Sequence, residues 1–319
     1  MKYYLKTSAP FILLLILLML TSCTQTEEKE KEQNTDDSDM IYTFENPQTQ
    51  QKFKIVHATP LVKQYIEKVK ENPKNSNLVL YKEEIIQPVY KDCFENGEFI
   101  YMAKNLLHSV PENFTELESI SQKIEDRKII INALIQEALL KSAELLPSHK
   151  DVAVCVFPTT DFNAPFVTVG AGKIIIPYNK YVDDDYIKVG VAHEYHHSFW
   201  AEKYLGNNSL SVLDNLIFEG KAVMFEKTVF PYLDYSPVDL TFNKELWSKI
   251  EPDLNKKDLN RSREILFGGN DLPLLYGYNE GYKMIKSYLD LHPNQTPEDW
   301  TALSSQEIIE KGKYFDKYK

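Results

Sequence analysis

The chain has 319 residues, a formal net charge of −11 at pH 7 and a pI of about 5.2. This acidic balance argues against nucleic acid and anionic lipid as main partners, since both are negatively charged themselves. The length beyond the first 40 residues suffices for one large domain or two small ones with a real hydrophobic core.

The N-terminus predicts export and membrane attachment. Lys2 and Lys6 precede the unbroken apolar run 11–20, which is too short to span a bilayer and is typical of a signal peptide. The Leu-Thr-Ser-Cys sequence that follows ends at Cys23 and resembles the lipobox of bacterial lipoproteins. We therefore expect a signal peptide over 1–22, a lipid such as palmitate on Cys23, and a location on the extracytoplasmic face of the cell membrane. The alternative is an ordinary secretory signal with an incidental cysteine.

The segments that follow predict a tether and then a helical region. Residues 24–39 contain no apolar side chain, so the stretch 23–40 with its lipidated cysteine is expected to be a flexible acidic tether. Residues 41–149 are predicted to be mainly helical. A 3.6-residue apolar rhythm, with a proline at the first helical position of the first segment, predicts helices over 59–73, 77–94 and 115–147.

Residues 150–319 predict a region that contains strands followed by helices. Short β-branched stretches bounded by turn residues predict strands, and longer periodic stretches predict helices. Asp183–Asp185 and Ser209 or Ser211 are candidate N-caps for two of the helices. The fold class is therefore α+β and mainly helical, with a small sheet. The predicted strands are 151–158 and 167–179, and the predicted helices are 186–205, 210–230, 272–293 and 296–315.

The sequence "HEYHH" concentrates three of the seven histidines of the chain and forms an H-E-x-x-H pattern. On a helix, His193 and His197 share one face and can converge on one metal ion. Glu194 is rotated by about 100° from His193 and can reach a metal-bound water without binding the metal. Two imidazoles and a carboxylate suit zinc, with a fourth position open for water. His196 lies off this face and is expected to pack as a hydrogen-bonded histidine.

A third oxygen ligand is expected on the next predicted helix. Glu219 lies 22 residues after His197, and a short turn between antiparallel helices would bring it opposite the histidine pair. Gly220 beside it permits close helix packing. Glu226 lies two turns further along nearly the same face and is the rival ligand. We favour Glu219 because it sits in the more apolar stretch, where a carboxylate needs a partner.

The stretches "HEYHH", "EGKA" and "YGYNEGYKMIKSYL" together resemble a family of predicted zinc-dependent proteases long classed as a domain of unknown function. The resemblance covers roughly residues 150–290 and implies a gluzincin-like site in a zincin-like metallopeptidase region, 150–319. It implies that His193, His197 and Glu219 bind zinc and that Glu194 is the catalytic carboxylate.

The chain departs from related patterns at two positions. The family usually has leucine where this chain has Lys221. Gluzincins of the thermolysin kind carry an aspartate four residues after the ligand glutamate, whereas this chain has Val223. The partner that orients a ligand histidine must therefore be built differently here or be absent.

Two tyrosines are candidate donors to the oxyanion of a peptide-bond hydrolysis. Tyr278 and Tyr282 lie in "YGYNEGY", and either could donate a hydrogen bond to developing negative charge; the alternative is that both pack in the core. The strand "VTVGAGKIII" precedes the histidine helix. It either leaves an edge open for an extended substrate or is a central strand with a bulge at Gly170 and Gly172.

These observations predict a membrane-anchored zinc metallopeptidase whose partner is a peptide or protein substrate. Glu194 would act as general base towards a metal-activated water. The alternative function is a non-catalytic solute- or metal-binding lipoprotein that uses the same histidine cluster, although this gives no reason for Glu194 beside His193. Cys93 and Cys155 could form one disulfide after export, but Cys155 lies in an apolar run, and we expect two free thiols.

Overall fold

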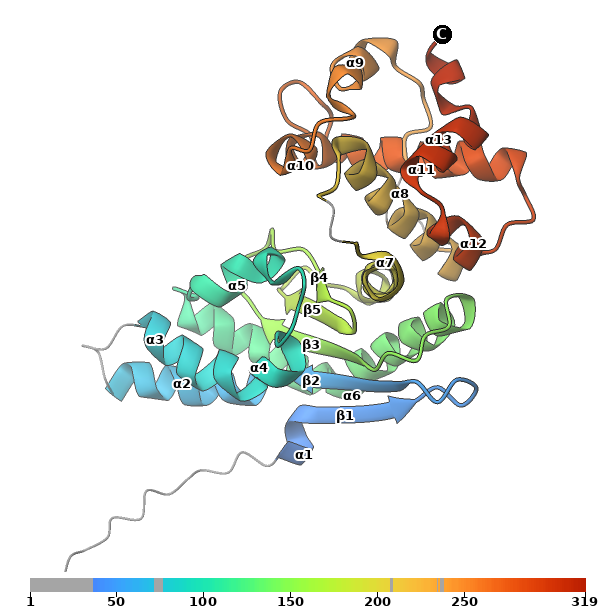
Figure 1. Cartoon of the computed structure of the whole chain (residues 1–319). Coiled ribbons are helices and arrows are strands. Elements are labelled where there is room, and N and C mark those ends of the chain that lie inside the picture. The colour runs from blue at the N-terminus through green and yellow to red at the C-terminus, as the bar shows by residue number, and fades with distance from the viewer. Residues whose placement is uncertain (1–36, 72–76, 207–208, 234, 236–237) are drawn as a thin grey trace, which may run out of the picture. The chain divides into compact units, whose positions relative to one another are not determined.

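The computed structural model describes residues 37–71, 77–206, 209–233, 235 and 238–319, with no side-chain detail at 37–38 (Figure 1). The described residues belong to one compact unit. The predicted signal peptide, Cys23 and most of the predicted tether lie outside them. The last four residues of that stretch form the short helix α1 (Asp37–Met40), in which Met40 is buried. No helix in the described part of the chain is long and apolar enough to cross a bilayer.

A five-stranded mixed sheet of order β1-β2-β3-β5-β4 forms the centre of the fold (Figure 1). The three middle strands are parallel to one another, and the two outer strands pair antiparallel with their neighbours. The predicted α+β class with a small sheet is confirmed. The two strands nearest the N-terminus were not anticipated. The strands are β1 (Ile41–Glu45), β2 (Lys52–His57), β3 (Val152–Pro158), β4 (Val167–Gly170) and β5 (Lys173–Tyr178).

Helices make up most of the described chain, and the predicted long helices form close to their predicted positions. The first group of helical elements is α2 (Thr59–Glu71), α3 (Asn77–Tyr81), the π-helical turn η1 (Lys82–Ile86), α4 (Gln87–Cys93), the 3₁₀ turn η2 (Ile100–Ala103), α5 (Lys104–His108) and α6 (Phe114–Leu145). The second group is α7 (Asp184–Tyr204), α8 (Val212–Val229), α9 (Lys244–Ser248), the 3₁₀ turn η3 (Glu251–Asp253), α10 (Leu259–Phe267), α11 (Tyr276–Leu291), α12 (Pro297–Ala302), α13 (Ser305–Gly312) and the 3₁₀ turn η4 (Tyr314–Tyr318).

Helix ends and breaks follow local chemistry. The side chain of Asp183 accepts a hydrogen bond from the Tyr186 backbone and begins α7, and Ser211 begins α8 with a reciprocal capping box. Both caps are among the predicted candidates. The helix predicted over 77–94 contains the π-helical turn η1 just before Pro88. Proline lacks a backbone N–H, so the regular hydrogen-bond ladder cannot continue there unchanged.

The sheet has an apolar core on each face because successive side chains of a strand point to opposite sides. Val154 and Val156 of β3 face a core shared with α6, α7, α8 and α11. Cys155 and Phe157 of the same strand face a second core shared with α2, α3 and α4. The continuous apolar run of β3 is therefore a strand buried on both faces.

Cys93 and Cys155 form a disulfide, so the expectation of two free thiols is wrong. The apolar run around Cys155 suggested a buried hydrophobic side chain, and the residue is indeed buried. However, its position in the second core faces the end of α4, where Cys93 is also buried. Alternation along the strand thus decides the pairing, because it turns Cys155 away from the first core and towards α4.

Each of the two readings of "VTVGAGKIII" holds in part, since β4 is an edge strand of the described sheet and β5 lies between β4 and β3. A register shift between Thr168 and Gly170 places an irregularity in this strand, as one of those readings proposed for its glycines. The outer side of β4 is partly occupied, since the Phe99 backbone N–H donates to the Val169 carbonyl at 2.9 Å. Gly172 has a φ of +79° and makes the turn into β5.

Candidate metal and catalytic site

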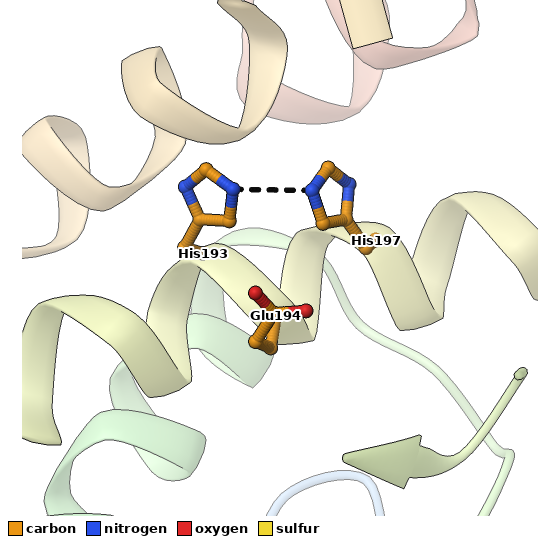
Figure 2. Close-up of side chains that lie close together, drawn as sticks. All are labelled: His193, Glu194 and His197. Atoms are coloured by element: carbon orange, nitrogen blue, oxygen red, sulfur yellow. Dashed lines mark hydrogen bonds between the residues drawn. The ribbon is translucent and has the colours of Figure 1, made fainter. Parts of the chain in front are cut away.

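α7 presents the two histidines of the H-E-x-x-H pattern on one side of the helix. Figure 2 shows both imidazole rings extending from the same side, with Glu194 between them along the helix. Nε2 of His193 and Nε2 of His197 are 3.1 Å apart. Because residues four apart lie one above the other on a helix, a regular α7 is enough to bring these atoms together.

α8 adds a carboxylate to this pair. Oε2 of Glu219 lies 3.3 Å from Nε2 of His193 and 3.2 Å from Nε2 of His197. The three atoms thus form a nearly equilateral triangle. Glu219 occupies the position that the sequence predicted opposite the histidines, and its side chain is largely buried.

Glu226 contacts the other side of the first imidazole. Its Oε2 lies 2.9 Å from Nδ1 of His193, and the carboxylate is buried. An acceptor at Nδ1 holds a proton there, so that Nε2 is the nitrogen available to bind a metal at the triangle. The rival ligand of the sequence analysis therefore lies where a carboxylate orients a ligand histidine. It supplies the partner that Val223 cannot.

The buried charges of this cluster perturb one another. Burial alone would raise the pKa of Glu219, but attraction to His197 and His193 and their hydrogen bonds outweigh it and lower the pKa to about 2. Burial lowers the pKa of His193, yet hydrogen bonds with Glu219 and Glu226 raise it well above the usual value. Both buried groups are therefore held in their charged forms by their oppositely charged partners.

Glu194 is buried beside the triangle without belonging to it. Its carboxylate, together with His193 and His197, offers ligand-type atoms that lie within 4.8 Å of one another. Burial raises the pKa of its carboxyl although both histidines lower it. Its backbone carbonyl accepts a hydrogen bond from Oγ1 of Thr168 at 2.7 Å, which fixes this turn of α7 against β4. The carboxylate lies within reach of a small molecule bound at the triangle.

Two glycines bring α11 close to the glutamate helix. A Cβ atom on Gly220 would lie 2.1 Å from the Gly281 backbone carbon, so only glycine permits this approach of α8 and α11. The sequence predicted close packing at Gly220, and its partner is α11. This contact explains why a glycine follows Glu219 and why another stands in "YGYNEGY".

The two candidate tyrosines have different surroundings. Tyr278 packs its ring 6.3 Å from that of His193, and burial together with the nearby Glu219 and Glu194 raises its pKa well above the usual value. Tyr282 is one turn further on, and the charges that affect it are those of Lys286 and Asp290. The structure thus brings Tyr278 to the histidines and leaves Tyr282 away from them.

His196 and Lys221 are buried near the site for structural reasons. Nε2 of His196 lies 3.2 Å from Oγ1 of Thr301, and the ring stacks on Trp300, as expected of a packing histidine. Nζ of Lys221 donates to the backbone carbonyls of Thr301 and Leu303 at 2.9 and 2.6 Å. These carbonyls end α12, so Lys221 satisfies groups that the helix leaves free. Its departure from the family pattern therefore has a local reason.

Two cavities meet at the histidines. The residues common to both linings are Pro165, Phe166, His193, Glu194 and Tyr278. The first cavity, which we call the α10 cavity, continues between η2 and α10 and also contains His197 and Glu219 in its lining. The second, which we call the α8 cavity, continues along α8 and contains Glu226 in its lining. An extended molecule bound across the histidines would therefore have space on both sides of them.

The arrangement of the three ligand-type atoms fits zinc. Four ligands at zinc–nitrogen distances of about 2.05 Å in a tetrahedron lie about 3.3 Å from one another. The triangle of His193, His197 and Glu219 has edges of 3.1, 3.3 and 3.2 Å. Without a metal, the raised pKa of His193 lets both of its ring nitrogens donate, Nδ1 to Glu226 and Nε2 to Glu219. A metal at the triangle would take the place of the proton on Nε2.

Some residues of the site could not have been found from the sequence. The wall formed by Phe99, Tyr101 and Met102 comes from a segment far from the motif. Arg263 lies on α10, a helix that no apolar pattern in the sequence predicted. Glu226 could have been placed near the site from the sequence, because a spacing of two helical turns puts it on the same face of the helix as Glu219.

Comparison with known protein families gave a match that covers the histidine helix. Residues 131–310, just over half of the chain, match the family described as "Predicted Zn-dependent protease (DUF2268)". No match was found among curated proteins or among solved structures.

Proposed function

The chain belongs to the family of predicted Zn-dependent proteases, and we propose that it is a zinc metallopeptidase that hydrolyses peptide bonds. The observation that carries this proposal is the triangle of His193 Nε2, His197 Nε2 and Glu219 Oε2 beside the buried carboxylate of Glu194. We assign zinc binding to His193, His197 and Glu219.

Zinc bound there would lower the pKa of a coordinated water and polarise the carbonyl group of the substrate. The protein residues around the site have separate tasks. Glu194 takes a proton from the attacking water and returns it to the leaving amine. Tyr278 donates a hydrogen bond to the oxygen that becomes negative as the carbonyl is attacked. Glu226 holds the imidazole of His193 in the orientation and tautomer that ligation needs.

The two cavities supply room for the peptide on either side of the reacting bond. Most of their lining is apolar, which excludes water from the reaction and favours hydrophobic side chains. β4 contributes Val167 and Thr168 to the α10 cavity. We therefore propose that the substrate lies across α7 between β4 and the helices α8 and α11.

We also propose that the protein is a lipoprotein held at the extracytoplasmic face of the membrane through Cys23. The support is the lipobox-like sequence after an apolar run. A Cys23→Ser variant should appear in the medium or keep its signal peptide. Unchanged fractionation with membranes would contradict the anchoring.

Glu194→Gln is the test of the catalytic proposal. The amide keeps the size of the side chain and can still hydrogen-bond, but it cannot accept the proton. We expect normal zinc content, a melting temperature close to wild type and peptide hydrolysis lowered by about 10²–10⁴-fold. Glu144→Gln, on the exposed side of α6, makes the same chemical change away from the site and should leave hydrolysis unchanged. Hydrolysis by Glu194→Gln at the wild-type rate would refute the mechanism.

A further inference from the structure

The α10 cavity combines an apolar lining with one permanent positive charge. Its walls include Phe99, Met102, Phe218, Leu266 and Phe267. Two of these side chains, Met102 and Phe267, are exposed to solvent. Exposed apolar side chains grouped at a cavity are typical of a ligand-binding groove. Such a lining suits a hydrophobic group of a substrate.

Arg263 projects from α10 into this lining. Among the described residues of the two cavities, it is the one guanidinium or ammonium group. Its Nη2 lies 3.7 Å from Sδ of Met102, and its guanidinium carbon lies 5.9 Å from the ring centre of Tyr101. Both contacts are weak, and they place the guanidinium at the opposite wall of the cavity.

The other two arginines of the chain are used differently. Arg127 pairs with Asp184, and Arg261 pairs with Asp253 and Glu264. Within the described part of the chain, Arg263 has no carboxylate within ion-pair distance, although the protein carries eleven more negative than positive charges. An arginine with five donors and no acceptor in reach is suited to a carboxylate that the protein itself does not provide.

Two carboxylates line each cavity, Glu194 and Glu219 in the α10 cavity and Glu194 and Glu226 in the α8 cavity. The cavities differ in cationic groups, since the described lining of the α8 cavity contains no arginine or lysine. A negatively charged group of a substrate is therefore favoured on the Arg263 side of the histidines and disfavoured on the other side. The position of Arg263 would therefore orient a charged peptide, with its carboxylate in the α10 cavity.

We propose that Arg263 binds a carboxylate of the peptide substrate and thereby selects peptides that carry one beside an apolar residue at the cleaved bond. This inference rests on the proposed peptidase function. The carboxylate is either the C-terminal group of the peptide or the side chain of an aspartate or glutamate. Both present two oxygens to the planar guanidinium and can form paired, charge-assisted hydrogen bonds.

Two matched substrate pairs test the proposal and separate the two sources of the carboxylate. One pair is an apolar peptide with a free C-terminus and the same peptide as its amide. The other pair has both ends blocked and carries glutamate or glutamine next to the cleaved bond. We expect kcat/KM to favour the charged member of at least one pair by about 10- to 100-fold, the effect of one or two charge-assisted hydrogen bonds.

Arg263→Met should remove this preference by lowering kcat/KM for the charged peptide far more than for its neutral partner. Arg263→Lys should keep part of the preference, since it retains the charge but loses the fork. Lys63→Met, on the exposed side of α2, changes the net charge of the protein equally and should keep the full preference. A preference that survives in Arg263→Met would overturn the proposal. So would an equal loss for both peptides, or a wild-type enzyme without any preference.

A binding measurement decides the same point without turnover. Calorimetry on Glu194→Gln protein with the same peptides should show tighter binding of the acid than of the neutral peptide, and the difference should vanish in the Glu194→Gln, Arg263→Met double variant. If the wild type hydrolyses no peptide, the proposed function fails, and the binding difference alone then decides whether Arg263 recognises a carboxylate. Equal binding of acid and neutral peptides would refute that recognition.

Discussion

Gly220→Ala would test how closely α8 and α11 must approach for the site to form. The added Cβ would lie 2.1 Å from the carbon, 2.3 Å from the oxygen and 2.6 Å from the Cα of Gly281. Ordinary contact begins at 3.4 Å, so the overlap exceeds one ångström and involves backbone atoms. A flexible side chain could move aside, but here the two helices themselves must separate.

Two opposing effects decide the size of the change. Alanine is favoured over glycine inside a helix by about 1 kcal/mol. Overpacking of a well-packed contact costs about 1–3 kcal/mol, and an overlap with backbone belongs at the upper end of that range or beyond it. We therefore expect a net loss of about 2 kcal/mol in the free energy of unfolding. In a domain of this size, that lowers the melting temperature by about 4 °C or more.

The same movement should also disturb the site, because Glu219 precedes Gly220 and Tyr278 lies one turn before Gly281. Zinc affinity, measured by competition with a chelating dye, should fall together with stability. Gly206→Ala is the matched control, since a Cβ there would meet nothing within 4 Å. A melting temperature and zinc affinity of Gly220→Ala equal to those of the control would refute the argument from close helix packing.

Three further changes have expected outcomes. Glu226→Gln should weaken zinc binding by about 10- to 100-fold while the protein stays folded, because it loosens the orientation of His193; unchanged affinity in a chelator competition would contradict that role. Burial lowers the pKa of Lys221 to about 7 in the folded protein. Between about pH 7 and pH 10 the unfolded chain therefore binds one more proton at this residue than the folded protein does, and the free energy of unfolding rises with pH across that window. Urea unfolding should show this rise, and Lys221→Met should flatten it. Replacing Cys93 and Cys155 by alanine releases a loop with a sequence separation of 62 and should cost about 4 kcal/mol by the loop-entropy argument; a urea midpoint equal to that of the oxidised wild type would count against the disulfide.

The sequence by itself determined the parts of the site that depend on one helix. His193, Glu194 and His197 are placed by the regular period of α7 alone, and the side chain of Asp183 begins that helix as the sequence predicted. Helical spacing also placed Glu219 and Glu226 on nearly one face. The α+β class followed from a change in pattern along the chain: residues 151–179 contain short β-branched runs bounded by turn residues, whereas the long segments on either side follow the helical period.

Only the tertiary structure decided what each member of the second helix contacts. Spacing could not say whether Glu219 or Glu226 meets Nε2, because both lie on the same face and the difference depends on how α8 crosses α7. The choice of Tyr278 over Tyr282 depends on the approach of α11 at Gly281. β1 and β2 were missed because their short, partly charged sequences carry little signal until β3 provides a partner for pairing. The partner of Cys155 and the position of Arg263 likewise follow from contacts between segments far apart in the chain, which no local pattern records.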